Sequence, residues 1–509
     1  MKTLKPLFLL LLVTSLSASA QIRVAVHESD PGPVIPKEIY GQFSEHLGRC
    51  IYDGIWVGPD SSIPNIDGYR KDVLEALKAL KVPVLRWPGG CFADEYHWRD
   101  GIGPRETRPR MINSNWGGTL EDNSFGTHEF LNLCEMLGTE PYISGNVGSG
   151  SVEELAKWVE YMTARGGTVA EERAANGRKE PWKVKYIGIG NESWGCGGNM
   201  TAEFYSDQYR RYATYCRDYD GNRLYKVASG ASDYDYNWTK VLMEKVGNRA
   251  DAVSLHYYTI TDWNHKGSAT DFTDGEYYDI IAKALEIEEV LRNHEHIMDT
   301  YDPQRRIDLL LDEWGTWFDV EPGTNPGHLF QQNSMRDALV AAMSLNIFNK
   351  HTARLKMANI AQIVNVLQSM VLTQGDKMLL TPTYHVFRMF NGHQDAVAVP
   401  VSFTCDTLQA PSGRLYSTLS VSASRTKEGK LLITLANPCL DKPQTVVLTL
   451  DAFRPKTVSG EILQAADVRA HNTFDKPRQV EPTAFSGAKI SGHTVTLTLP
   501  PASVVAVTL

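Results

Sequence analysis

Residues 186–195 read Tyr-Ile-Gly-Ile-Gly-Asn-Glu-Ser-Trp-Gly. The apolar, β-branched run 184–189 is typical of a buried strand, and it delivers Asn191 and Glu192 to its carboxyl end. A single glutamate there could equally cap the next helix or pair with an arginine. A second apolar run, 307–311, is followed by Glu313 and a tryptophan. Because the carboxyl ends of parallel barrel strands form one face, the two glutamates indicate a carboxylate pair, which glycoside hydrolysis requires.

Apolar strand-like runs alternate with amphipathic helical stretches from about residue 39 to about residue 365. Such alternation is typical of a parallel α/β sheet, and eight strand runs are the number that a barrel needs. The runs are 39–43, 82–86, 140–144, 184–189, 225–229, 252–256, 307–311 and 354–358. The sequence therefore predicts an α/β fold with a (β/α)8 TIM barrel over residues 39–390.

The composition changes after about residue 390. Alternating or β-branched runs then lie between Pro, Gly, Asp and Asn turns, as in all-β sandwiches, at 431–435, 445–450, 493–499 and 503–509. We predict a C-terminal, jelly-roll-like β-sandwich over residues 391–509. The early strand-like run within residues 21–38 has no partner nearby, and we expect it to join this sandwich.

The N-terminus resembles an export signal. Residues 1–20 contain two lysines, a short apolar run and the sequence Ala-Ser-Ala, which predict a signal peptide that is cleaved before Gln21. The apolar run is shorter than the ~20 residues that a membrane span needs. The sequence therefore predicts an exported protein, in the periplasm or the medium, that is not held in a membrane.

Charge and cysteine content exclude other classes. The 509 residues carry a formal net charge of −9 and contain no basic run, which argues against nucleic acid as a partner. Seven cysteines are too few and too scattered for a disulfide scaffold, and their pairing cannot be assigned. No zinc motif, complete dinucleotide-binding pattern or serine-hydrolase elbow is found. We therefore predict no metal and no cofactor.

Further polar residues follow the predicted strand ends. Each alone is more often structural, because Gly-Gly makes turns and a buried Tyr is often merely hydrogen-bonded. Their placement on one face favours a sugar site, which needs aromatic walls and side chains that bond hydroxyl groups. They include Glu45 and His46, Cys91, Asn146, His256 with Tyr257 and Tyr258, and Gln362.

Five segments together resemble the α-L-arabinofuranosidases of glycoside hydrolase family 51. They are Ile39–Gly54, Leu85–Phe92, His97–Pro104, Gly190–Gly195 and Asp312–Trp317. The similarity runs in order through the predicted barrel and extends to the C-terminal strands. Asn-Glu alone is shared by a wider clan of retaining barrel glycosidases, whereas the five segments together are specific.

The resemblance implies roles for individual residues. Glu192 would be the general acid/base and Glu313 the nucleophile. Sugar contacts would come from Glu45, Asn191, Tyr258 or its neighbour Tyr257, Trp317 and Gln362. The chain departs from the family at Cys91, where many members have asparagine, so that contact would fall to sulfur or backbone. The resemblance also implies a homo-oligomer, commonly a hexamer.

The function predicted is that of an exo-acting, retaining α-L-arabinofuranosidase. Its partners would be arabinan, arabinoxylan and the oligosaccharides derived from them. One alternative is another retaining barrel glycosidase, of β-xylosidase or endoglucanase type, because a carboxylate pair does not specify the sugar. Another is a secreted polysaccharide-binding protein without catalysis, against which the intact carboxylates argue.

Overall fold

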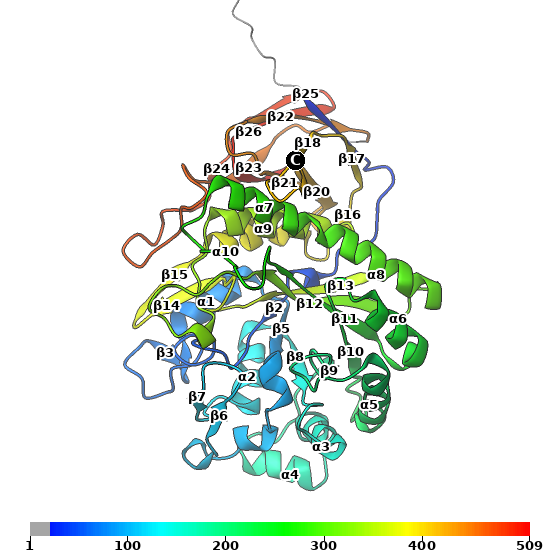
Figure 1. Cartoon of the computed structure of the whole chain (residues 1–509), viewed down its shortest axis with the longest axis vertical. Coiled ribbons are helices and arrows are strands. Elements are labelled where there is room, and N and C mark those ends of the chain that lie inside the picture. The colour runs from blue at the N-terminus through cyan, green and yellow to red at the C-terminus, as the bar shows by residue number, and fades with distance from the viewer. Residues whose placement is uncertain (1–20, 453) are drawn as a thin grey trace, which may run out of the picture.

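A closed barrel of eight parallel strands forms the larger part of the chain (Figure 1). The structure is a computed structural model, and it describes residues 21–452 and 454–509. The predicted signal peptide, residues 1–20, lies outside the described residues. In barrel order the strands are β2 (Gln42–Phe43), β5 (Val84–Trp87), β8 (Glu140–Gly145), β9 (Tyr186–Ile189), β10 (Tyr225–Ser232), β11 (Ala252–Thr259), β12 (Asp308–Thr316) and β13 (Leu355–Ala361).

All eight predicted barrel strands are present, and the predicted fold class is confirmed. The first strand is shorter than predicted. Lys37–Tyr40 forms a 3-10 helix, η1, and only Gln42 and Phe43 pair with β13 and β5. Pro36, the residue before η1, has φ −58° and ψ 134°, an extended conformation, and the chain turns in the residues that follow it.

Ten α-helices are found in the described part of the chain. Ser151 caps α3 by accepting a hydrogen bond from the Glu154 amide, as its capping-box sequence predicts. The helices are α1 (Lys71–Leu80), α2 (Thr127–Leu137), α3 (Val152–Thr163), α4 (Thr168–Ala175), α5 (Ala202–Tyr215), α6 (Tyr236–Lys245), α7 (Asp274–Leu285), α8 (Ile287–Tyr301), α9 (Met335–Phe348) and α10 (Pro382–Phe390).

The C-terminal region consists of two antiparallel-rich sheets, which lie at the top of Figure 1. One contains β17 (Val401–Phe403), β1 (Ile22–Val26), β22 (Gln444–Leu450), β26 (Thr494–Leu499) and β25 (Ala488–Ser491). The other contains β16 (Val397–Ala398), β20 (Ser420–Arg425), β21 (Leu431–Asn437), β27 (Ser503–Thr508), β23 (Ser459–Gln464) and β24 (Thr483–Ala484). The N-terminal strand β1 pairs parallel to β22 and antiparallel to β17.

Short two-stranded hairpins lie outside the barrel and the two larger sheets. They are β3 (Asn65–Ile66) with β4 (Tyr69–Arg70), β6 (Met111–Asn113) with β7 (Thr119–Glu121), β14 (Val371–Gln374) with β15 (Lys377–Leu380), and β18 (Thr407–Gln409) with β19 (Leu415–Ser417). Among the described helices, none combines the length and apolar character needed to cross a bilayer.

Helix α9 joins the barrel to the sandwich. It contacts β12 on the barrel side and β20, β21 and β27 on the sandwich side. Every residue of α9 is buried, including Arg336 and Asp337. A helix that is apolar on all sides needs a partner on all sides, and here the two regions supply it. The contact fixes the sandwich beside the barrel.

Candidate active site

Two consecutive acidic residues of β12 lie side by side in the barrel. Successive side chains of a regular strand point to opposite faces. The strand β12 is not regular here, however. Its register with β13 shifts between Leu311 and Trp314, and its register with β11 shifts in the same part of the strand. Asp312 and Glu313 are both buried, and both approach the Arg86 guanidinium. A β-bulge, which re-aims side chains, therefore brings both carboxylates to one site.

Arg86, at the end of β5, is the cation of this site. Its Nη1 donates to Glu313 Oε1 at 2.8 Å, and its Nη2 donates to Asn191 Oδ1 at 2.6 Å. Its Nε lies 3.6 Å from Asp312 Oδ2. The Arg86 side chain is 2% exposed, so these are interactions in a water-poor interior. The planar guanidinium thus fixes the nucleophile candidate relative to Asn191.

The loop after β9 presents Asn191 and Glu192. Gly190 has φ +86° and Glu192 has φ +38°, a left-handed conformation that costs a side chain free energy and clusters at functional sites. Asp94 supports this loop, because its Oδ2 accepts the Asn191 amide at 3.1 Å. The Asn191 Nδ2 donor is buried without a partner in the described structure, so it is free to bond a sugar hydroxyl.

His256 of β11 connects the acidic groups. Its Nδ1 lies 2.8 Å from Glu192 Oε1 and 3.6 Å from Glu313 Oε2, and its Nε2 lies 3.1 Å from Asp312 Oδ1. Burial lowers the His256 pKa, but the charge of Glu313 and the bonds to Asp312 and Glu192 outweigh it and raise the pKa to about 10. At neutral pH His256 is therefore an imidazolium that donates from both ring nitrogens.

Glu192 and Glu313 are close together and differ in their surroundings. One carboxylate oxygen of Glu192, one carboxylate oxygen of Glu313 and one ring nitrogen of His256 all lie within 4.8 Å of one another. Burial, opposed by the His256 hydrogen bond and reinforced by the Glu313 charge, raises the Glu192 pKa above its usual 4.5. Glu313 accepts bonds from Arg86 and from Tyr258 Oη, each at 2.8 Å. Glu313 is thus bonded by two donors, whereas burial favours the protonated form of Glu192.

A third carboxyl, Glu45, faces the pair from the end of β2. Its Oε1 accepts the Gly90 amide at 3.0 Å and Trp116 Nε1 at 2.9 Å, and its Oε2 accepts Gln362 Nε2 at 2.8 Å. Burial and the Glu313 charge raise the Glu45 pKa to about 7. Glu45 and Gln362, predicted from strands at opposite ends of the barrel sequence, are thus direct neighbours.

Aromatic rings form one side of the site. Tyr258 and Trp317 meet edge to face with ring centroids 5.0 Å apart, and Trp263 lies 5.5 Å beyond Trp317. Tyr258 bonds Glu313, whereas the hydroxyl of Tyr257 donates to the Lys283 carbonyl behind the barrel strands. Of the two tyrosines that the sequence left open, Tyr258 is the one whose hydroxyl lies at the carboxylate pair.

The turn after β5 approaches the carboxylates closely. A Cβ on Gly90 would stand 2.8 Å from Glu313 Oε1, and a Cβ on Gly89 would stand 2.6 Å from Glu45 Cγ. Only glycine leaves this space open. Cys91 follows and forms a disulfide with Cys196, a pairing that the sequence did not assign. Its sulfur lies 3.8 Å from Glu192 Oε2.

The structure brings all eight residues predicted for the site to one end of the barrel. The sequence interpretation gave no site role to Arg86, Asp94, Trp116 or Asp312, and it named His256 only among the polar residues that follow the predicted strands. For two of these a signal existed, because Arg86 and Asp312 are charged residues inside apolar strand runs, where a charge needs a partner. Trp116 lies in a loop, and nothing in its local sequence marks it.

A pair of neighbouring carboxyl groups at the carboxyl ends of (β/α)8 strands, one with a raised pKa and one bonded by two donors, defines a barrel glycoside hydrolase. Family models described as "Alpha-L-arabinofuranosidase 1 domain" and "Alpha-L-arabinofuranosidase C-terminal domain" match residues 76–275 and 312–503. A Bacteroides ovatus protein named "Intracellular exo-alpha-L-arabinofuranosidase" is 60% identical over 97% of both chains. The chain belongs to the α-L-arabinofuranosidases of glycoside hydrolase family 51.

Solved structures agree with this membership. The family 51 arabinofuranosidase from Xanthomonas axonopodis pv. citri matches with a TM-score of 0.95 and 46% identity, over 96% of this chain and 99% of that one. The α-L-arabinofuranosidase from Thermotoga maritima, solved as an arabinose complex, matches with a TM-score of 0.85 and 30% identity, over 96% and 100%. The predicted family and enzyme class are therefore confirmed.

One prediction is wrong on these comparisons. The sequence predicted export to the periplasm or the medium, but the 60% identical relative, covered over 97% of its length, is named intracellular. The prediction rested on the composition of residues 1–20. Lysines before a short apolar run are a compositional signal, and composition alone does not record whether a cell's export machinery accepts the segment.

Proposed function

We propose that this exo-acting α-L-arabinofuranosidase hydrolyses its substrate with retention of configuration, with Glu313 as the nucleophile and Glu192 as the acid/base. The separation of the two carboxyl groups supports this. Retaining pairs lie about 5–5.5 Å apart, and inverting pairs lie about 6.5–9.5 Å apart to admit a water. Oxygens of Glu192 and Glu313 that lie within 4.8 Å of each other fit the retaining arrangement.

In the first step the Glu313 carboxylate attacks the anomeric carbon. The bond from that carbon to the leaving oxygen breaks, and Glu192 donates its proton to that oxygen. An arabinosyl ester of Glu313 remains. In the second step the Glu192 carboxylate takes a proton from water while the water oxygen attacks the anomeric carbon, and the ester bond breaks. Two inversions at one carbon give net retention.

The neighbouring residues serve these two steps. Arg86 and Tyr258 donate to Glu313 and hold its carboxylate in position. The His256 imidazolium bonds Glu192 Oε1, so Oε2 is the oxygen left for proton transfer. Asn191, Glu45 and Gln362 are assigned to sugar hydroxyls, Trp317 to a wall of the site, and Cys91 to its rim.

Chemical rescue tests the assignment. Glu313→Ala should be inactive on every arabinofuranoside. Glu192→Ala should lose about 10²- to 10⁴-fold on substrates with a basic leaving group, the range of general acid catalysis, but should still accept a dinitrophenyl arabinofuranoside. Azide needs no base, so it should accelerate Glu192→Ala and give an arabinosyl azide of retained configuration. Product configuration is read by nuclear magnetic resonance.

Glu203→Ala, which changes an exposed glutamate in the first turn of α5, is the matched control and should be unaffected by azide. A retained azide product from Glu313→Ala would reverse the two assignments. An inverted product from the wild-type enzyme with its natural substrate would refute the retaining mechanism.

The proposal has finer parts. We assign arabinan, arabinoxylan and their oligosaccharides as substrates, a homo-oligomer of the hexameric kind as the assembly, and residues 39–390 as the catalytic barrel with 21–38 and 391–509 as its supporting sandwich. No metal or cofactor enters the proposed steps. Faster turnover of nitrophenyl arabinofuranoside than of the xyloside and glucoside supports the sugar assignment, and light scattering tests the assembly.

A further inference from the structure

A disulfide stands beside the proposed acid/base at the mouth of the barrel. It joins Cys91, in the 3-10 helix η2 (Cys91–Asp94) after β5, to Cys196 in the loop after β9, 105 residues away in sequence. Cys196 is exposed and Cys91 is partly exposed, so solvent reaches the bond. The other described cysteines are free, and all except Cys405 are buried. The solvent-accessible cysteines of the described chain thus include the Cys91–Cys196 pair at the candidate active site.

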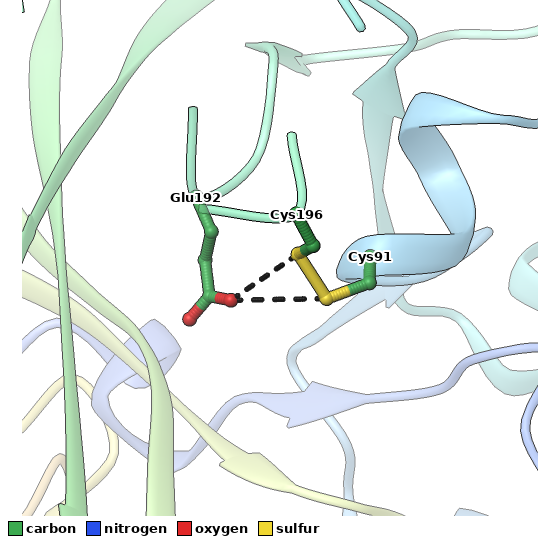
Figure 2. A group of neighbouring side chains, drawn as sticks. All are labelled: Cys91, Glu192 and Cys196. Atoms are coloured by element: carbon green, nitrogen blue, oxygen red, sulfur yellow. Dashed lines mark hydrogen bonds between the residues drawn. A yellow bond between two sulfur atoms is a disulfide. The ribbon is translucent and has the colours of Figure 1, made fainter. Parts of the chain in front are cut away.

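Glu192 approaches both sulfurs with one oxygen. Its Oε2 lies 3.8 Å from Cys91 Sγ and 3.4 Å from Cys196 Sγ, as Figure 2 shows. Disulfide sulfurs carry no proton, so in the oxidised protein neither contact is a donated hydrogen bond. Two sulfurs and a carboxylate oxygen that converge in this way are a ligand set for a metal ion.

The distances suit tetrahedral zinc. With Zn–S near 2.3 Å and Zn–O near 2.1 Å, a sulfur and an oxygen ligand are about 3.6 Å apart and two sulfurs are about 3.8 Å apart. The sulfur–oxygen distances in the structure, 3.8 and 3.4 Å, lie on either side of the separation of about 3.6 Å expected for two zinc ligands of these kinds. Once the disulfide is broken, rotation of the two side chains can separate the sulfurs, because their Cα atoms lie 5.4 Å apart.

We propose that reduction of the Cys91–Cys196 disulfide creates a binding site for a thiophilic divalent metal ion, held by the two thiolates and the Glu192 carboxylate, and that the bound ion switches the enzyme off. Water completes the tetrahedron. Thiolate ligands select zinc-like ions over the hard ions Mg²⁺ and Ca²⁺, which prefer oxygen.

The reductant is a dithiol. One of its thiolates attacks Sγ of the exposed Cys196, the Cys91–Cys196 bond breaks, and a mixed disulfide forms. The second thiolate of the reductant then displaces Cys196, which leaves two cysteine thiols and an oxidised, cyclic disulfide. When the ion binds, each thiol gives up its proton to solvent. Re-oxidation of the pair or removal of the ion reverses the change.

The bound ion would stop catalysis because it takes Glu192, the proposed acid/base, as a ligand. Glu192 Oε1 is occupied by His256, and the ion would occupy Oε2, the oxygen that faces the sulfurs. Glu192 would then have no oxygen left to carry a proton to the leaving group. This consequence rests on the proposed role of Glu192, whereas the ligand set itself does not.

Cobalt(II) is the probe for the site, because thiolate ligation gives it an intense charge-transfer absorption. The whole enzyme is reduced with dithiothreitol, desalted without oxygen and titrated. Reduced wild type should bind one equivalent with the thiolate band, and zinc should displace it. Oxidised wild type and reduced Cys196→Ala should show no band. Cys405→Ser, which changes a partly exposed cysteine of the sandwich, is the matched control and should behave as wild type.

Activity on a nitrophenyl arabinofuranoside gives the second measurement, expressed for each protein as the ratio with and without zinc. Zinc should inhibit reduced wild type and reduced Cys405→Ser at least tenfold more strongly than oxidised wild type or Cys196→Ala, and chelation should restore turnover. The melting temperature of each variant shows that it is folded.

Three results would overturn the inference. One is the absence of a thiolate band in reduced wild type. Another is zinc inhibition of the oxidised enzyme and of Cys196→Ala that is as strong as that of reduced wild type, which would place the ion among Glu192, His256 and Glu313 instead. The third is a thiolate band without inhibition. Failure of the proposed function is seen separately, as full activity of metal-free Glu192→Ala on substrates with basic leaving groups.

Discussion

The variant Arg86→Lys tests whether Arg86 acts through its positive charge alone or also through the fixed geometry of its guanidinium. Lysine keeps a buried cation near Asp312 and Glu313 but cannot donate from two fixed nitrogens, so we expect the 2.6 Å bond to Asn191 to be lost. A hydrogen bond to a charged group contributes about 1.5–3 kcal/mol. Because 1.36 kcal/mol is a factor of ten in rate, kcat/KM should fall about 10- to 160-fold.

The fold should tolerate this change, because the two buried carboxylates stay compensated. Arg86→Met removes one of the two cations beside them and leaves only the His256 imidazolium, at a cost of up to about 3–5 kcal/mol, so its melting temperature should fall clearly below that of Arg86→Lys. The assay is kcat and KM on a nitrophenyl arabinofuranoside, with calorimetry of each variant.

Arg99→Lys is the matched control, since Arg99 pairs with Glu172 on the surface, and it should leave both kcat/KM and the melting temperature unchanged. Wild-type kcat/KM in Arg86→Lys would refute the positioning role. So would identical kinetics and melting temperatures for Arg86→Lys and Arg86→Met.

Two further predictions concern protonation. Burial, opposed by His256 and reinforced by Glu313, raises the Glu192 pKa above 4.5, so kcat/KM should fall as pH rises through that higher value. This alkaline limb should vanish for Glu192→Ala on a dinitrophenyl substrate, and its persistence there would assign it to another group. Burial likewise raises the Asp94 pKa from 3.8 to about 7, despite the amides of Val147, Gly148 and Asn191. The protonated acid is therefore favoured by folding, and its stabilisation is present below pH 3.8 and lost as pH rises through 7, at up to about 1.36 kcal/mol per pH unit. The melting temperature should fall from pH 5 to pH 8 in wild type and less steeply in Asp94→Asn; equal slopes would contradict this account.

Much of the barrel could be predicted from the sequence because its signals are local. An apolar run of strand length followed by a polar residue identifies a barrel strand and its active-site end, as at Asn191–Glu192 and at Glu313. The ends of the strands were less predictable. Residues 39 and 40 of the predicted strand 39–43 lie in a 3-10 helix instead, since an apolar sequence does not record whether a neighbour is in register to pair with it.

The sequence by itself determined which residues end the strands and that two of them are the glutamates of one face. Only the tertiary structure decided how those residues meet. In a regular strand the side chains of Asp312 and Glu313 would point to opposite faces. The register shift in β12 turns both of them toward Arg86. Cys91 and Cys196 meet because β5 and β9, on either side of β8, bring their loops together when the barrel closes. Register and closure depend on pairing between distant segments, and for that reason no local pattern contains them.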